Sequence, residues 1–112
     1  MPTRYEVVAR EGVIGWSELE FGDPPSGLAY GRFHPSDLYR SASHAGPDAD
    51  LHARPEGTDE FFRLSGGVFI EDHSPDHGPE GMEVSVVGLD ADTYEQYFPE
   101  HLKVHEQQFR SK

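Results

Sequence analysis

The hexapeptide Gly22-Asp23-Pro24-Pro25-Ser26-Gly27 interrupts the chain more sharply than any other segment. Its two prolines fix φ, Pro24 pushes Asp23 into an extended conformation, and Gly27 can adopt backbone angles that are closed to other residues. We therefore expect a stiff connection between two strands, one that precedes it and one that covers residues 28–33.

Upstream of this connection the sequence predicts a β-hairpin. Residues 4–10 alternate between apolar and polar side chains, which is the period of a half-buried strand. Glu11-Gly12 then offers a two-residue turn, because glycine tolerates positive φ. In the returning strand the apolar side chains change parity between Trp16 and Leu19, so one regular strand cannot bury them all. We expect a β-bulge near Ser17-Glu18 that corrects this.

Downstream of the connection the pattern predicts short elements separated by loops. Ser36 is expected to cap a short helix, and Thr58 is expected to start another helical turn. Residues 41–57 lack a periodic apolar pattern and are expected to form a long loop. Val68-Phe69-Ile70 is apolar throughout, which favours a strand covered on both faces. The strands expected in this half of the chain cover residues 64–71 and 83–89.

The C-terminal region predicts a helix with one buried face. Its large apolar and aromatic residues recur at spacings of three and four. Asp90 or Asp92 is expected to cap this helix, and Pro99 is expected to kink it or to open a second helix. The sequence thus predicts one α+β domain over residues 1–112, with a mostly antiparallel sheet of about five strands, a short central helix and a C-terminal helical segment.

The chain is strongly acidic. Asp and Glu number 21 against nine Lys and Arg, which gives a formal net charge of −12 over 112 residues. Nucleic acids and anionic membranes are therefore unfavourable ligands, since binding to both depends on Lys and Arg. A field of this sign favours a basic partner or a cation, although acidity can also serve only to keep a protein in solution. One segment, between Leu64 and Leu102, has no Lys or Arg and nine carboxylates: Glu71, Asp72, Asp76, Glu80, Glu83, Asp90, Asp92, Glu95 and Glu100.

Three features that the sequence lacks indicate the cellular compartment in which the protein is expected. There is no Cys, so neither disulfides nor thiolate metal ligands are available. The apolar runs are far shorter than the roughly 20 residues that a membrane-spanning helix needs. The N-terminus leads into alternating polar and apolar residues and shows no secretory signal. We therefore expect a cytoplasmic protein.

Aromatic and acidic residues around the proline-rich connection form the most distinctive candidate binding site. Trp16, Tyr30 and Phe33 would supply an aromatic patch with an acidic border. Aromatic residues surrounded by polar ones are typical of interaction hot spots, although a single Trp on a strand is more often part of the core. A second acidic group is expected at the start of the C-terminal helix. The expected binding residues are Trp16, Glu18, Glu20, Asp23, Tyr30, Asp90, Asp92 and Glu95.

Histidines suggest an alternative, a divalent metal site. His101 and His105 have the four-residue spacing that lets two imidazoles on one helix bind one metal ion. His73 and His77 each follow an Asp in one loop, which is a donor set that divalent ions accept. The competing interpretation is ordinary helix histidines and a solvated loop, in which case the chain has no cofactor.

The sequence assigns no catalytic residue. Without Cys, nucleophilic catalysis needs Ser, His and an acid, and no Gly-x-Ser-x-Gly elbow occurs. Gly66-Gly67 lacks the Lys and Ser/Thr that a nucleotide-binding loop requires. Carboxylate pairs such as Glu18 and Glu20 can perform acid–base chemistry, but such pairs arise by chance among 21 acidic residues. The sequence does not decide whether the protein is an enzyme, and it favours a protein without enzyme activity.

Two segments resemble parts of known sequences. The stretch Trp16-Ser17-Glu18-Leu19-Glu20-Phe21-Gly22-Asp23-Pro24-Pro25-Ser26-Gly27 resembles one found in short bacterial proteins of unassigned function. The tail with Tyr97-Phe98-Pro99 and the later Phe109 is similar to the ends of those proteins. The resemblance implies a bacterial origin and a small stand-alone domain, and it brings no catalytic residues with it.

These observations lead to one main functional hypothesis and two competing ones. The main one is an acidic protein-interaction module that binds a basic partner surface, of the immunity, antitoxin or regulatory type. The first competitor is a small metal-binding or metal-dependent enzyme that uses His73, His77, His101 and His105. The second is a structural module whose charge is incidental. Homodimerisation through an exposed strand edge is also left open.

Overall fold

A computed structural model describes residues 4–45 and 49–110 of the chain. Within these ranges the protein is an α+β structure with two antiparallel sheets of four strands each, and the fold class predicted from the sequence is confirmed. Eight strands in two sheets replace the predicted five in one. The additional strands are two to four residues long, which is too short to produce a recognisable alternation.

The first sheet, sheet A, has the strand order β5-β2-β1-β6. The hairpin at its centre is confirmed, with its two-residue turn at Arg10-Glu11, one residue earlier than expected. The connection from β4 to β5 carries the chain from sheet B into sheet A through Phe33, which is completely buried. The strands of sheet A are β1 (Tyr5–Ala9), β2 (Gly12–Ser17), β5 (His34–Pro35) and β6 (His52–Pro55).

The predicted bulge near Ser17-Glu18 is wrong in position. The register of the hairpin shifts between Val7 and Val8, where the extra residue is Ile14, and this shift directs Ile14 into the core. At the end of β2 the chain changes direction through Leu19, whose φ is +47°. Two features therefore let the chain bury apolar side chains of both parities. One is the bulge inside the hairpin, and the other is the left-handed conformation of Leu19 after β2.

The second sheet, sheet B, has the strand order β3-β4-β8-β7. The proline-rich connection joins β3 to β4 and contains a turn of 3-10 helix, η1 (Pro24–Ser26). This turn ends at Gly27, whose φ of 64° lies in the left-handed region, so the predicted connection between two strands and the unusual conformation of Gly27 are confirmed. The strands of sheet B are β3 (Phe21–Asp23), β4 (Leu28–Arg32), β7 (Gly67–Asp72) and β8 (Met82–Val87).

The inner faces of the two sheets enclose one hydrophobic core. Alternate residues of the long strands point inward, as the burial of Val7, Ala29 and Val84 shows. The prediction that Val68-Phe69-Ile70 is covered on both faces is wrong, because Phe69 is 37 % exposed while its two neighbours are buried. Sheet B therefore has one buried face and one face in contact with solvent.

The helix predicted after Ser36 lies further along the chain, where α1 spans Ser41–His44. The Ser36 hydroxyl forms other bonds. It donates to the carbonyl oxygen of Val13 at 2.7 Å and accepts from the N–H of Leu38 at 3.2 Å. These bonds form a local turn that attaches this part of the chain to β2 and compete with helix formation at Ser36.

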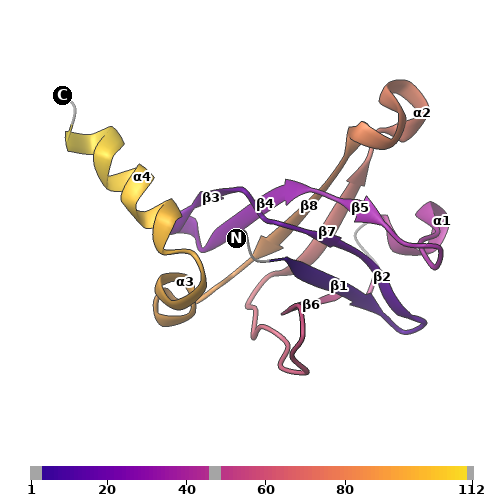
Figure 1. Cartoon of the computed structure of the whole chain (residues 1–112), viewed down its shortest axis with the longest axis horizontal. Helices are drawn as coiled ribbons and strands as arrows, with labels where there is room; N and C mark the ends of the chain where they lie inside the picture. The colour runs from indigo at the N-terminus through magenta and orange to yellow at the C-terminus, as the bar shows by residue number, and fades with distance from the viewer. Residues whose placement is uncertain (1–3, 46–48, 111–112) are drawn as a thin grey trace.

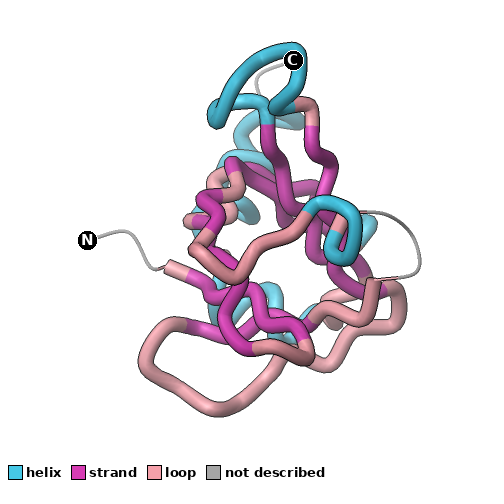
Figure 2. The backbone as a smooth tube through the Cα atoms, turned by 90° about the vertical axis from the view of Figure 1, so that its right-hand side faces the viewer, coloured by secondary structure: helices cyan, strands magenta, loops and turns pink. Residues whose placement is uncertain are grey.

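The segment 41–57, predicted to be a loop, contains α1 and β6 in its described part. The four-residue strand β6 pairs antiparallel with β1 and becomes an edge of sheet A. No helix forms at Thr58, because its hydroxyl donates to the carbonyl oxygen of Pro55 within a turn. Figure 2 shows the connection from β6 to β7 as a long loop.

The C-terminal region forms two helices, as expected from Pro99. They are α3 (Ala91–Tyr97) and α4 (Pro99–Arg110), with Pro99 at the start of the second. Figure 1 shows α4 projecting from one end of the molecule, while the short helices α2 (Ser74–His77) and η2 (Gly78–Gly81) lie at the other end. None of the helices in the described ranges has the length and apolar character that crossing a bilayer requires.

Candidate functional site: an acidic cleft between the β2–β3 connection and the C-terminal helices

A cleft of about 640 Å³ lies between the β2–β3 connection and the junction of α3 with α4. Three carboxylates line it, those of Glu18, Glu20 and Glu100. Tyr5, Leu19, Gln96, Tyr97, Phe98, Pro99 and His101 form the rest of its lining. No Lys or Arg is found among these described lining residues, so the cleft combines uncompensated negative charge with aromatic surface.

The β2–β3 connection forms one wall of the cleft. The hydroxyl of Ser17 is completely buried and accepts the N–H of Leu19 at 3.0 Å, which holds the connection in its turn. The left-handed conformation of Leu19 places its own side chain in the core and leaves Glu18 and Glu20 on the wall. A carboxylate oxygen of Glu20 also accepts the N–H of Arg32 at 3.4 Å, so this wall is bound to β4.

Helices α3 and α4 form the opposite wall, and capping fixes where α3 begins. The carboxylate of Asp90 accepts the N–H of Thr93 at 2.7 Å, which confirms Asp90 as the N-cap. This hydrogen bond holds the pKa of Asp90 below its usual range, because the charged carboxylate is the better acceptor.

Tyr94 and His101 attach these helices to the sheets. The Tyr94 hydroxyl donates to the carbonyl oxygen of Leu28 at 2.9 Å, and Nε2 of His101 donates to that of Leu19 at 2.8 Å. Burial raises the pKa of Tyr94 to about 12, and the nearby charge of Asp23 adds to the effect. The rings of Phe98 and His101 are stacked, with centroids 5.3 Å apart, and both contribute to the surface of the cleft.

The structure brings only part of the predicted binding set together. Glu18 and Glu20 both line the cleft. Glu95 lies on α3 next to Gln96, which also lines the cleft. Asp90 and Asp92 lie at the start of α3; Asp90 lines another hollow, next to the proline-rich connection. Asp23, Trp16 and Tyr30 lie outside the cleft. Glu100, which the sequence did not single out as a binding residue, completes the cleft from α4.

The predicted aromatic patch is wrong, because its three rings occupy three different places. Trp16 lies on the outer face of sheet A, Tyr30 lies on the outer face of sheet B, and Phe33 is buried between them. Arg4 and His34 flank Trp16 in place of the acids expected around it. The guanidinium of Arg4 lies 4.1 Å from its ring centroid, and the ring of His34 is stacked on it at 4.0 Å. Both faces of the indole are therefore occupied by the chain itself.

The predicted histidine ligands are not brought together. His73 is paired with Glu71 at 3.5 Å beside sheet B, whereas His101 donates to a carbonyl oxygen at the base of α4. His105 lies further along α4, and the side chain of His77 lies outside the described residues. Over the described part of the chain no group of three or more His, Asp or Glu residues is arranged to hold a metal ion.

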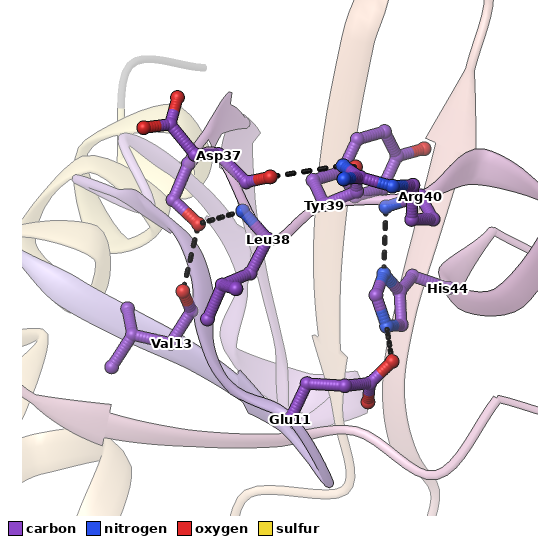
Figure 3. Close-up of polar contacts among 8 residues, drawn as sticks. Glu11, Val13, Asp37, Leu38, Tyr39, Arg40 and His44 are labelled. Carbon is purple, nitrogen blue, oxygen red and sulfur yellow. Dashed lines mark hydrogen bonds and ion pairs between the residues drawn. The ribbon is translucent and has the colours of Figure 1, made fainter.

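A second polar constellation surrounds the buried His44. As Figure 3 shows, Nδ1 of His44 accepts the N–H of Arg40 at 2.9 Å, and Nε2 faces the carboxylate of Glu11 at 3.1 Å. A backbone hydrogen bond and the bond to His44 hold the pKa of Glu11 below its ordinary value. No local pattern predicts this contact, because Glu11 and His44 are 33 positions apart and His44 lies in the segment 41–57, which has no periodic apolar pattern.

The hydrogen bonds of His44 stabilise the fold. The His44 side chain is only 3 % exposed and both ring nitrogens are engaged, so no substrate can reach the ring. Nearby, the Tyr39 hydroxyl donates to the carboxylate of Asp72 at 2.7 Å and links the same loop to β7. Burial, followed by this bond, raises the pKa of Tyr39, whereas hydrogen bonds from Ser74 and Tyr39 lower that of Asp72.

The chain matches no protein-family model, no curated protein and no solved structure. Carboxylates beside aromatic rings offer charge-assisted hydrogen bonds together with a flat surface, and this combination suits a guanidinium or ammonium group.

Proposed function

We propose that this protein is an acidic binding module that receives a basic segment of a partner protein in the cleft between the β2–β3 connection and the junction of α3 with α4. The observation that carries the proposal is the composition of the cleft, in which Glu18, Glu20 and Glu100 lie around the partly exposed ring of Tyr97, with the buried Phe98 behind it. An Arg or Lys side chain fits this lining, because its charged head can reach the carboxylates while its stem covers the rings.

The charge of the whole molecule supports the same partner. A net charge of −12 attracts a basic protein from a distance and increases the rate of encounter, most strongly at low ionic strength. The charges are also distributed unevenly. On the outer face of sheet A, Arg54 is paired with Glu6 at 2.9 Å and Arg4 lies over Trp16, whereas on the outer face of sheet B the carboxylates of Asp23, Glu71 and Glu83 outnumber Arg32. A basic partner is therefore steered toward sheet B and the cleft beside it.

The competing functions have less support. The metal hypothesis needs histidines to converge, and those whose side chains are described lie apart. An enzyme needs an accessible reactive group with a partner that activates it. The most highly organised histidine, His44, is buried, and both of its nitrogens serve the fold.

A peptide titration tests the proposal. The probe is a short arginine-containing peptide, and its control is the same peptide with the arginines replaced by citrulline, which keeps the shape and removes the charge. Calorimetry is expected to show saturable binding of the arginine peptide that weakens as salt is raised, and no binding of the citrulline peptide. Equal binding of the two peptides would contradict the proposal.

Variants localise the binding to the cleft. Glu18→Gln and Glu100→Gln are each expected to weaken binding of the arginine peptide by about fivefold, the scale of one partly exposed ion pair. The matched control is Glu60→Gln, which removes the same charge from an exposed position in the β6–β7 loop. An equal loss of affinity in Glu60→Gln would mean that net charge, and not the cleft, determines binding.

A further inference from the structure

A band of aromatic residues crosses the outer face of sheet B. Antiparallel pairing places Phe21 opposite Tyr30, Tyr30 opposite Ser85 and Ser85 opposite Phe69, so one row of side chains spans all four strands. The rings of Phe21 and Tyr30 are stacked with centroids 5.6 Å apart. We refer to Phe21, Tyr30 and Phe69 as the aromatic band.

The band lies in contact with solvent. Phe21 is 56 % exposed and Phe69 is 37 % exposed, although both are large apolar residues on well-paired strands. The alternate residues of the same strands, such as Ala29 and Val86, are completely buried on the inner face. The exposure of the band is therefore a consequence of the register. Phe21 and Tyr30 form one stacked pair and Ser85 separates it from Phe69, and exposed aromatic surface with a charged border is typical of an interaction site.

Charged residues border the band on both sides. Asp23 belongs to one neighbouring row, and Arg32, Glu83 and Glu71 belong to the other. Glu71 and Glu83 lie directly opposite each other on β7 and β8, and each has a nearby basic residue, His73 at 3.5 Å from Glu71 and Arg32 opposite Glu83 on β4. A hollow of about 400 Å³ lies next to them, and Phe21 from the band also lines it.

We propose that the outer face of sheet B is a second docking surface, and that its occupant is an extended, arginine-bearing segment of a partner protein. Guanidinium groups stack on aromatic rings and bridge carboxylates, so the arginines of an extended segment can contact both the aromatic band and the carboxylates of Asp23, Glu71 and Glu83 that border it. Lysine forms these contacts less well, because its ammonium group is compact and strongly hydrated.

The position of the face supports this choice of partner. Glu20 lines the cleft and its carboxylate accepts the N–H of Arg32, while the next residue along the chain, Phe21, begins the aromatic band. A segment that enters the cleft can therefore continue across the sheet. The inference relies on the proposed function for the positive charge of the partner, but it concerns different residues.

A second copy of the chain is a poorer occupant. Each copy carries a net charge of −12, so stacking two of these faces brings like-charged molecules together. The four charged residues of the face also carry a net negative charge, since Asp23, Glu71 and Glu83 outnumber Arg32. Charge complementarity therefore points to a basic partner.

The experiment compares two peptides with alternating sequence, one of Arg and Val and one of Lys and Val. The arginine peptide is expected to bind at least about threefold more tightly than the lysine peptide, because a planar guanidinium stacks on the rings better than a strongly hydrated ammonium group does. Phe21→Ala and Phe69→Ala are each expected to weaken binding of the arginine peptide by about threefold to tenfold. Circular dichroism of each variant confirms that the fold is retained.

The matched control is Phe61→Ala. Phe61 is also exposed, at 41 %, but its ring lies 5.3 Å from the guanidinium of Arg54 near sheet A. Its removal is expected to leave the affinity for the peptide unchanged. An equal loss in Phe61→Ala, or equal binding of the two peptides, would overturn the inference.

The two proposals can fail separately. If Glu18→Gln and Glu100→Gln weaken binding while Phe21→Ala and Phe69→Ala do not, the proposal of a second docking surface is contradicted and the proposal of binding in the cleft is supported. If only the phenylalanine variants weaken binding, the cleft is wrong and sheet B is the docking surface. Self-association in sedimentation that Phe69→Ala abolishes would assign the face to a second copy and overturn the inference.

Discussion

His101 and Leu19 are 82 positions apart in the chain, yet Nε2 of His101 donates a hydrogen bond of 2.8 Å to the carbonyl oxygen of Leu19. Leu19 has a φ of +47°, so its carbonyl is presented by a turn that is itself held by the buried Ser17. This bond joins the two walls of the acidic cleft. The width of the cleft and the position of α4 therefore depend on it.

We expect His101→Ala to loosen α4 from the body of the protein. The substitution removes a hydrogen bond and the stacking of His101 on Phe98, and a loss of about 1–2 kcal/mol in unfolding free energy is expected. Urea denaturation measures this loss, and hydrogen exchange is expected to show faster exchange along α4. His52→Ala is the control, because the His52 side chain is 54 % exposed. Equal effects of the two substitutions would show that the contact with Leu19 does not hold the helix.

The contact between Glu11 and His44 predicts a pH dependence of stability. The pKa of Glu11 lies below its ordinary value of 4.5 in the folded state, so the unfolded state binds more protons in this range. Stability is therefore expected to increase with pH up to the ordinary value, and this contribution is lost as pH falls through the folded pKa. Denaturation curves near pH 3 and pH 6 check the direction.

A variant isolates the role of Glu11 in that dependence. Glu11→Gln is expected to flatten the dependence of stability on pH near the ordinary pKa of glutamate, whereas Glu60→Gln leaves it unchanged. Asp72 and Asp90 also have lowered pKa values, so part of the dependence remains in Glu11→Gln. A curve for Glu11→Gln that coincides with that of the parent protein would rule out the coupling.

The cap at Asp90 predicts a difference between two similar substitutions. Asp90→Ala removes the acceptor of the Thr93 N–H and is expected to lower the melting temperature by roughly 4 °C. Asp90→Asn keeps an acceptor at the same position and is expected to retain most of the stability. Melting curves that rank the two variants in the opposite order would contradict the assignment of the cap.

Gly22 predicts a steric limit where β3 meets the C-terminal helices. A Cβ atom at this position would collide with the hydroxyl of Tyr94 and lie 2.9 Å from Cδ2 of His101. Gly22→Ala is therefore expected to cost about 1–3 kcal/mol. Adding Tyr94→Phe removes the colliding atom, so the double variant is expected to lose less than the sum of the two single losses. Strict additivity in denaturation experiments would show that the two residues do not meet.

Local patterns in the sequence predicted the elements whose signal is contained in a few neighbouring residues. The hairpin, the rigid turn at Pro24-Pro25, the cap at Asp90 and the break at Pro99 all follow from the conformational limits of Pro, Gly and Asp. The strands β5 and β6 were missed because they are shorter than one clear alternation. The exposed position of Phe69 was missed because an apolar run does not reveal which residue faces solvent.

The candidate site was predictable only in part. Glu18 and Glu20 were identified as binding residues, but Glu100 joins them through the docking of α4, which no local pattern describes. Trp16 and Tyr30 are separated because the chain passes from sheet A to sheet B between them. Residues close in sequence were thus assumed to share one surface, and the crossing between the sheets places them on opposite sides of the core.

The most direct test of the account is a nuclear magnetic resonance titration of the labelled protein with the arginine peptide at low salt. The account predicts saturable shifts of the backbone amides that line the cleft, those of Leu19 and of residues 96–101, with only Pro99 lacking an amide to report. It also predicts that these shifts disappear in the double variant Glu18→Gln/Glu100→Gln. An absence of saturable shifts, or shifts confined to sheet A around Trp16, would contradict the proposal that this acidic cleft binds a basic segment.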